Sequence, residues 1–144
     1  MKQQIAYPLN FGLNKTGLTL IAVEMEGEIL CLLVDTGATL NLLDKRVYEH
    51  FNKCNSHESI HTNTISNFGI DGVEKAAKRA ELNFSFEDNL FTTKFTIFDA
   101  STAFDKVEEE SGIQIHGILG NEFLLENEWI IDFEKQAVIF EIKP

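Results

Sequence analysis

The chain has 144 residues, of which 44% are apolar and 12 are phenylalanine. This length suits one ordinary domain with a sizeable core, and the composition excludes general disorder. Acidic residues outnumber basic residues by 23 to 12, so the formal net charge is −11. Because nucleic-acid-binding proteins meet phosphates with Lys and Arg, we expect no nucleic acid partner.

The longest uninterrupted apolar run, Ile29–Val34, has only six residues. A membrane-spanning helix needs about 20 apolar residues, so no membrane partner is expected. Residues 1–4 are not followed by the apolar stretch of a signal peptide. We therefore expect a cytoplasmic location, unless a leader has been removed.

The first predicted elements are two strands, residues 18–26 and 28–35, which form a hairpin around Gly27. The second strand is apolar almost throughout, so it is expected to be central and covered on both faces. Further along, Asp44 can cap a short helix that continues to about Phe51.

The middle of the chain is predicted to form a second hairpin. A polar strand at 60–65 approaches a turn-rich tip at 67–72, and the chain returns through residues 73–86. The most basic segment, Lys75–Arg79, lies among acidic residues and is interpreted as a solvated face. Residues 90–98 alternate between apolar and polar side chains, which predicts a further strand.

The last third begins with a predicted loop at residues 99–112. It is followed by a strand, one or two helical turns and a closing hairpin, at residues 113–119, 121–125 and 129–142. These patterns predict a single mostly-β domain with one or two short helices. Its core is expected to span residues 17–142, with residues 1–16 as an N-terminal extension.

The two cysteines provide no disulfide framework. One group of metal-ligating residue types is present, namely His50, Cys54, His57 and His61. The last three have plausible ligand spacing, but the paired arms of a structural zinc site are missing. A polar surface loop is the preferred interpretation, so we expect no metal and no cofactor.

The segment that carries chemistry is Asp35-Thr36-Gly37, at the end of the apolar strand. A carboxylate there is costly unless it is hydrogen-bonded or partly protonated. Thr36 supplies a hydroxyl, and Gly37 permits a tight turn because it lacks a Cβ atom and tolerates unusual dihedral angles. The tripeptide alone is only moderately specific, and an aspartate that merely caps a turn is the alternative.

A second segment makes the pattern more specific. Ala38 and Thr39 follow the tripeptide, and the run from Ile115 to Gly120 precedes the predicted helix at 121–125. Together these segments resemble the retropepsin-like aspartic proteases, the retroviral protease clan and its bacterial relatives, over residues 18–142. The resemblance implies a closed β-barrel or sandwich of the acid-protease fold. It also implies that Asp35 is the catalytic residue. The implied scaffold around it consists of Thr36, Gly37, Ala38, Ile118, Leu119 and Gly120.

In this family two aspartates share a proton: one carboxylate activates a water molecule while the other polarises the scissile carbonyl. The chain has no second D-T-G or D-S-G. The resemblance therefore implies a homodimer in which each chain contributes Asp35, with Thr36 hydrogen-bonded across the dimer axis. The implied function is an aspartic endopeptidase that binds a peptide or protein substrate in extended conformation.

The resemblance also implies a flap, a hairpin that closes over the substrate. By position its substrate-facing residues are Ile65, Asn67, Phe68, Gly69, Ile70 and Gly72. An ordinary surface hairpin is the alternative.

The chain also departs from the family pattern. Retroviral enzymes pair an Asp shortly after the D-T-G with an Arg after the late glycine, and here those positions hold Thr39 and Asn121. Both halves of the pair are absent together, which indicates a different set of interactions rather than decay of the site. The hairpin at 129–142 is expected in the core, either alone or together with a role in the dimer interface.

Two other functions stay open. One is a catalytically silent retropepsin-fold module that dimerises or binds peptide, although such a module needs no costly buried carboxylate at Asp35. The other is a small metal- or ligand-binding β-barrel with its site at residues 50–61. Metal analysis separates the latter, and peptide cleavage with and without pepstatin separates the protease from the silent module.

Overall fold

The computed structural model describes residues 3–54, 61–70 and 73–142, and within residues 54–77 it describes the backbone alone. The strands are β1 (Gln4–Pro8), β2 (Leu20–Met25), β3 (Glu28–Val34), β4 (Leu42–Asp44), β5 (His61–Ile70), β6 (Val73–Phe86), β7 (Asn89–Phe98), β8 (Gly117–Leu119), β9 (Ile130–Asp132) and β10 (Ala137–Glu141). The helices are α1 (Asn10–Thr16), α2 (Lys45–Cys54), α3 (Ser101–Ser111) and α4 (Asn121–Glu126).

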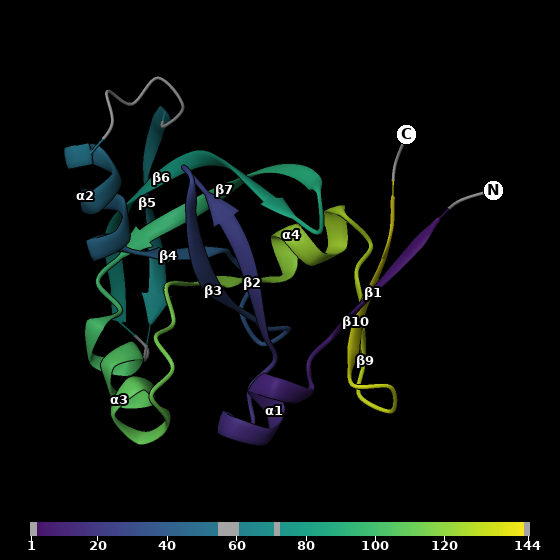
Figure 1. Ribbon diagram of the computed structural model, residues 1–144. Helices are drawn as coiled ribbons and strands as arrows, with labels where there is room; N and C mark the ends of the chain where they lie inside the picture. Colours follow the sequence, from purple (N-terminus) through teal and green to yellow (C-terminus); the bar gives the residue numbers. More distant parts are fainter. Residues whose placement is uncertain (1–2, 55–60, 71–72, 143–144) are drawn as a thin grey trace.

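Six strands close into a barrel in the order β2-β3-β8-β4-β7-β6, and β6 returns to β2 where Ser85 pairs with Glu24. Two neighbouring pairs are parallel, β3 with β8 and β4 with β7, and the others are antiparallel. Strand β5 extends the sheet as the partner of β6 (Figure 1). The closed, mostly-β architecture expected from the sequence is confirmed.

The barrel interior is filled by an apolar cluster rich in aromatic rings. Strand β3 contributes every second residue to it, namely Leu30, Leu32 and Val34. Trp129 packs between Phe123 of α4 and Phe140 of β10, with ring centroids 4.9 Å apart in both cases. Aromatic pairs at this distance contribute beyond their buried area. The cluster therefore holds the barrel, α4 and the C-terminal hairpin together.

The terminal segments form a separate sheet in the order β1-β10-β9. Its centre is Ile139 of β10, which pairs with Ala6 on one side and Ile130 on the other. Strand β1 and helix α1 lie in the first sixteen residues, where the sequence pattern indicated no element. Val138 and Phe140 are buried, so the expected place of the C-terminal hairpin in the core is confirmed.

Helix α3 occupies the segment that was predicted to be a loop, so that prediction is wrong. Its one buried residue, Phe104, packs against Leu20, Ala100 and Ile115 in a second apolar cluster. A helix with one buried residue has little apolar periodicity, which is why the pattern did not reveal it. Four helices are described instead of one or two, and β8 begins only at Gly117, later than expected.

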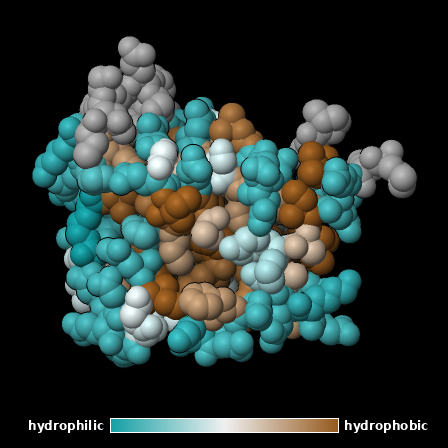
Figure 2. Space-filling model, in the orientation of Figure 1, coloured by the Kyte–Doolittle hydropathy of each residue, from teal (hydrophilic) through white to brown (hydrophobic). Residues whose placement is uncertain are grey.

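The outer face of β3 is covered only in part. Ile29 is 67% exposed, and Cys31 and Leu33 are half-buried against the second cluster. The expectation that both faces of this strand are covered is therefore wrong. Figure 2 shows apolar side chains gathered in a hollow over β2 and β3, with hydrophilic residues around it. In the described ranges, no helix is long and apolar enough to cross a membrane.

Candidate active site

Asp35 lies directly after β3 and is half-buried. Its backbone N–H donates to the Leu119 carbonyl of β8 at 3.0 Å, which fixes the end of the strand. The Gly37 N–H donates to Asp35 Oδ1 at 2.8 Å. Within the residues that the structure describes, this is the only hydrogen bond to the carboxylate. The other oxygen, Oδ2, is therefore available for a proton or a water molecule.

The Gly37 position favours glycine because there is little room for a Cβ atom, and not because the backbone has a positive φ. The glycines with positive φ in the described residues are Gly17, Gly27 and Gly112. A Cβ atom at Gly37 would lie 3.1 Å from Asp35 Oδ1, which is unusually close. The expectation that Gly37 serves its turn through unusual dihedral angles is therefore wrong, and the approach of the carboxylate is the reason for glycine.

Val34, the last residue of β3 and the one before Asp35, is hydrogen-bonded to Thr19. The Val34 N–H donates to the Thr19 carbonyl at 2.8 Å, and Thr19 Oγ1 donates to the Val34 carbonyl at 2.5 Å. Thr19 is buried, so water does not compete for these bonds.

The loop that carries Asp35 is hydrogen-bonded to the first turn of α4. The Asn121 N–H donates to the Ala38 carbonyl at 2.8 Å, and Asn121 Nδ2 donates to the Thr36 carbonyl, also at 2.8 Å. The Thr36 side chain is exposed. Asn121 therefore binds the D-T-G loop through both its backbone and its side-chain amide.

The scaffold residues expected from the late segment lie beside this loop. Ile118 and Leu119 pair with Leu33 and Val34 in the parallel β3–β8 ladder. Gly120 follows them and is buried, and a Cβ atom there would collide with the backbone carbonyl of Leu40. Glycine lets the two loops meet at backbone distance.

Asn41 is a site residue that the sequence interpretation missed. Its fully buried side chain accepts the Gly120 N–H at 2.9 Å through Oδ1. Its Nδ2 donates to Thr93 Oγ1 at 3.0 Å and to the Lys94 carbonyl at 2.9 Å. Asn41 thus ties the loop after Asp35 to both β7 and the end of β8.

Arg79 also differs from the sequence interpretation. It is 9% exposed rather than solvated, and its guanidinium makes a two-pronged ion pair with Glu122. Glu122 in turn accepts the Asn41 N–H through Oε1 at 2.6 Å. The solvated-face interpretation is wrong for Arg79, because strand β6 buries this side chain beside α4.

The expected flap region is an antiparallel hairpin of β5 and β6. Ile65 pairs with Lys78 and Ile70 with Val73, so the strands run together to the turn. Figure 1 shows β3 and β5 running in the same direction, so the turn end of β5 and the Asp35 end of β3 face the same way. The other proposed flap residues in β5 are Asn67, Phe68 and Gly69, and Gly72 lies outside the described residues.

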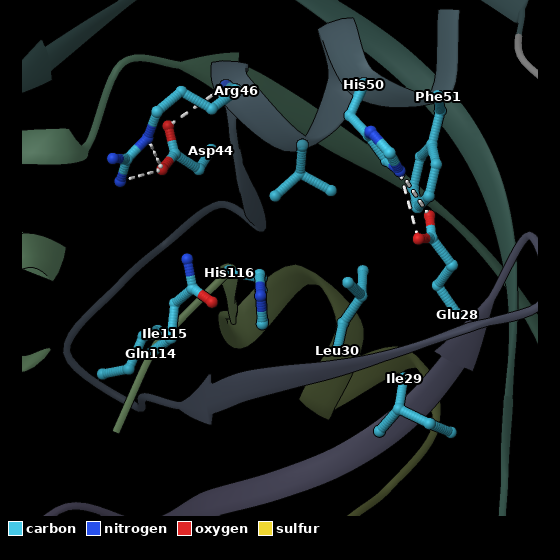
Figure 3. A pocket seen from close by; sticks show the side chains of 11 residues that line it. Glu28, Ile29, Leu30, Asp44, Arg46, His50, Phe51, Gln114, Ile115 and His116 are labelled. Atoms are coloured by element: carbon cyan, nitrogen blue, oxygen red, sulfur yellow. Dashed lines mark hydrogen bonds and ion pairs between the residues drawn. The ribbon is translucent and has the colours of Figure 1, made fainter. Parts of the chain in front are cut away.

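A separate cleft of about 390 Å³ lies at the opposite end of β3 (Figure 3). Leu30 lines it, and five residues of strand, roughly 16 Å, separate Leu30 from Asp35. Its charged groups pair with each other: His50 Nε2 contacts Glu28 at 2.9 Å, and Arg46 Nη2 contacts Asp44 at 2.8 Å.

This cleft includes one residue of the possible metal cluster, His50. Another, His57, lies outside the described residues. In the part of the chain that the structure describes, no three metal-ligating side chains come together. The side chains of Cys54 and His61 also lie outside the described part of the chain, so this part includes only His50 of the four residues.

Two groups beside β3 have shifted pKa values. Burial raises the pKa of the Cys31 thiol from 9.0 to about 11. Burial also lowers the pKa of His116, although the charge of Asp44 opposes this shift. The Cys31 N–H donates to His116 Nδ1 at 2.9 Å, which requires an unprotonated Nδ1. Both side chains are therefore neutral near pH 7.

No protein-family model and no curated protein matches the sequence. Solved structures do match. The retroviral protease-like domain of Ddi1 from Leishmania major aligns with a TM-score of 0.59 and 11% identity, over 88% of this chain and 94% of that one. A retropepsin-like aspartic protease from Rickettsia conorii aligns with a TM-score of 0.57 and 15% identity, over 98% of this chain and 91% of that one. The chain therefore has the retropepsin-like fold of aspartic proteases.

Proposed function

We propose that two copies of this chain form an aspartic endopeptidase, with one Asp35 from each chain in the catalytic dyad. The observation that carries the proposal is the setting of Asp35. Its half-buried carboxylate has one oxygen bound by the Gly37 N–H, on a loop that is hydrogen-bonded to β8 and α4. In a retropepsin-like fold this is where a dyad carboxylate is needed.

The reaction follows from two carboxylates that share one proton. The ionised carboxylate takes a proton from a water molecule, and the water oxygen attacks the scissile carbonyl carbon. The protonated carboxyl group donates a hydrogen bond to the carbonyl oxygen and stabilises the charge that develops there. The carboxyl group that took the proton from water then gives it to the amide nitrogen as the C–N bond breaks, which releases the amine and restores the dyad with one proton. One chain supplies one such group, so the partner must supply the other.

The hairpin of β5 and β6 is the proposed flap. It points the same way as the Asp35 end of β3 (Figure 1). A substrate in extended conformation would lie between the two and bond to strand backbone. This assigns substrate contact to the same six residues as the sequence prediction, namely Ile65, Asn67, Phe68, Gly69, Ile70 and Gly72.

The terminal sheet and its surroundings are the proposed dimer contact. Three large apolar side chains near it are exposed: Leu125 at the end of α4 (77%), Ile130 of β9 (54%) and Phe133 after β9 (66%). Large exposed apolar side chains are typical of interaction surfaces, and we propose that these three face the partner chain. The hairpin at 129–142 would thus serve both the core and the interface.

The test is cleavage of an apolar peptide library by the wild-type protein and by Asp35→Asn. The variant should lose all turnover yet unfold at the wild-type temperature, because Asn keeps the shape of the carboxylate but cannot act as a base. Pepstatin should inhibit the wild type.

The matched control is Asp88→Asn, the same chemical change at an exposed turn residue with φ 63°, where Asn is well tolerated. It should keep full activity. Turnover by Asp35→Asn would refute the dyad. A wild-type protein that binds peptides without cutting them would favour the silent module instead.

A further inference from the structure

We propose that Arg79 and Glu122 form a positioning pair that joins the base of the flap hairpin to the loop carrying Asp35. The inference rests on the proposed function, since it assigns these residues to the same catalytic site. Neither residue is among the site residues expected from the sequence.

The geometry of the pair is that of a fixed fork. Arg79 Nη2 donates to Glu122 Oε2 at 2.6 Å, and Nη1 donates to Oε1 at 3.0 Å. Nη1 also donates to Thr96 Oγ1 of β7 at 2.8 Å. The Arg79 side chain is 10% exposed and that of Glu122 is 25% exposed. An arginine held in this way has one orientation, which a lysine could not reproduce.

On its other side, Glu122 contacts the loop after Asp35 twice. Its Oε1 accepts the Asn41 N–H at 2.6 Å, and its own N–H donates to the Thr39 carbonyl at 3.1 Å. The same carboxylate oxygen therefore accepts one hydrogen bond from Arg79 and one from the loop. Removing Arg79 frees the carboxylate to turn toward water, and Asn41 then loses a fixed acceptor.

Arg79 lies on β6, the second strand of the hairpin, which begins at Val73. It pairs with Thr64 of β5 on one side and with Thr96 of β7 on the other. Arg79 is thus where the hairpin leaves the barrel. The pair gives the flap and the catalytic loop one common anchor, so a displacement of either affects the other.

The kinetic test compares Arg79→Met, Arg79→Lys, Glu122→Gln and the double variant Arg79→Met with Glu122→Gln. Arg79→Met should lower kcat roughly ten- to a hundredfold, because small misplacements of a catalytic group have effects of this size. KM should change less than about threefold, because neither side chain is proposed to touch substrate. Arg79→Lys should recover part of kcat. The double variant should be no slower than Arg79→Met, because no charge is left unpaired.

The matched control is Arg46→Met. Arg46 also binds a buried carboxylate, Asp44, but in the described residues its hydrogen bonds go only to Asp44 and Asp105. It lies on α2, so its loss should affect stability and leave kcat unchanged. If Arg46→Met lowers kcat as much as Arg79→Met does, the pair has no special role and the inference fails.

Hydrogen exchange separates this inference from the proposed function. In Arg79→Met the amides of Asn41, Asn121 and Glu122 should exchange faster than in the wild type, whereas in Arg46→Met they should not. If the wild type shows no cleavage that depends on Asp35, the proposed function is wrong. The exchange rates would still show whether the Arg79–Glu122 pair holds the loop in place. Unchanged exchange at these amides in Arg79→Met would overturn the inference.

Discussion

Gly120 and Asn41 show how single residues bring the two loops of the site together. A side chain at Gly120 would overlap with the carbonyls of Leu40 and Ala38, so only glycine allows this approach. Asn41 then accepts the Gly120 N–H that the approach would otherwise leave buried and unpaired. Gly120 thus allows the two loops to approach, and Asn41 supplies the hydrogen bond that the approach requires.

At the residue scale, His116 gives the stability of the fold a pH dependence, through its contact with Cys31 of β3. Burial lowers the pKa of folded His116, whereas an unfolded His titrates near its usual pKa of about 6.5. Between these values the unfolded chain binds more protons than the folded chain. The contribution of neutral His116 to the free energy of unfolding is thus fully present above about pH 6.5. It is lost as the pH falls toward the pKa of His116 in the folded chain.

Replacing His116 by Asn should remove this part of the pH dependence, since the Asn Oδ1 can accept the Cys31 N–H without titrating. The measurement is the unfolding free energy in urea between pH 7.5 and 5. The wild type should lose more stability over this range than His116→Asn. Parallel curves for the two proteins would show that His116 does not titrate with unfolding.

At the scale of elements, the terminal sheet depends on β1. Five residues of β1 pair with β10, and β1 leaves β10 without an open edge, because β9 covers its other side. Tyr7 also packs edge-on against Phe86 of the barrel, with ring centroids 4.8 Å apart. The first strand is therefore structural, although its sequence has no strong strand pattern.

Deletion of residues 1–8 should consequently weaken the fold and promote association. It removes the five β1–β10 residue pairs and opens the edge of β10, which is a template for pairing with other chains. Thermal unfolding should shift to lower temperature, and light scattering should rise with concentration. A truncated chain as stable and as dispersed as the full chain would contradict this role of β1.

For the whole molecule, the proposed dyad makes activity a property of the dimer. A net charge of −11 on each chain opposes association, and salt screens that repulsion. Activity per chain should therefore fall on dilution, and added salt should move the midpoint to lower protein concentration.

Sedimentation measured alongside cleavage provides the check. The dimer fraction and the activity per chain should fall together. Cleavage by a sample that sediments only as monomer would contradict a dyad built from one aspartate per chain.

The sequence by itself determined the features that depend on neighbours along the chain. The apolar run of β3, its end at Asp35 and the hairpin of β5 and β6 are local patterns, and strand alternation with glycine breaks reveals them. The tertiary structure alone decided which distant groups meet. Arg79 looked solvated because its partner Glu122 lies 43 positions away, and Asn121 reaches Thr36 across 85 positions. Helix α3 was missed because one buried phenylalanine, placed by the outer face of the barrel, decides its packing. Local periodicity records which side of an element is buried, whereas the hydrogen-bond partner of a buried polar group depends on strand order, which no local pattern contains.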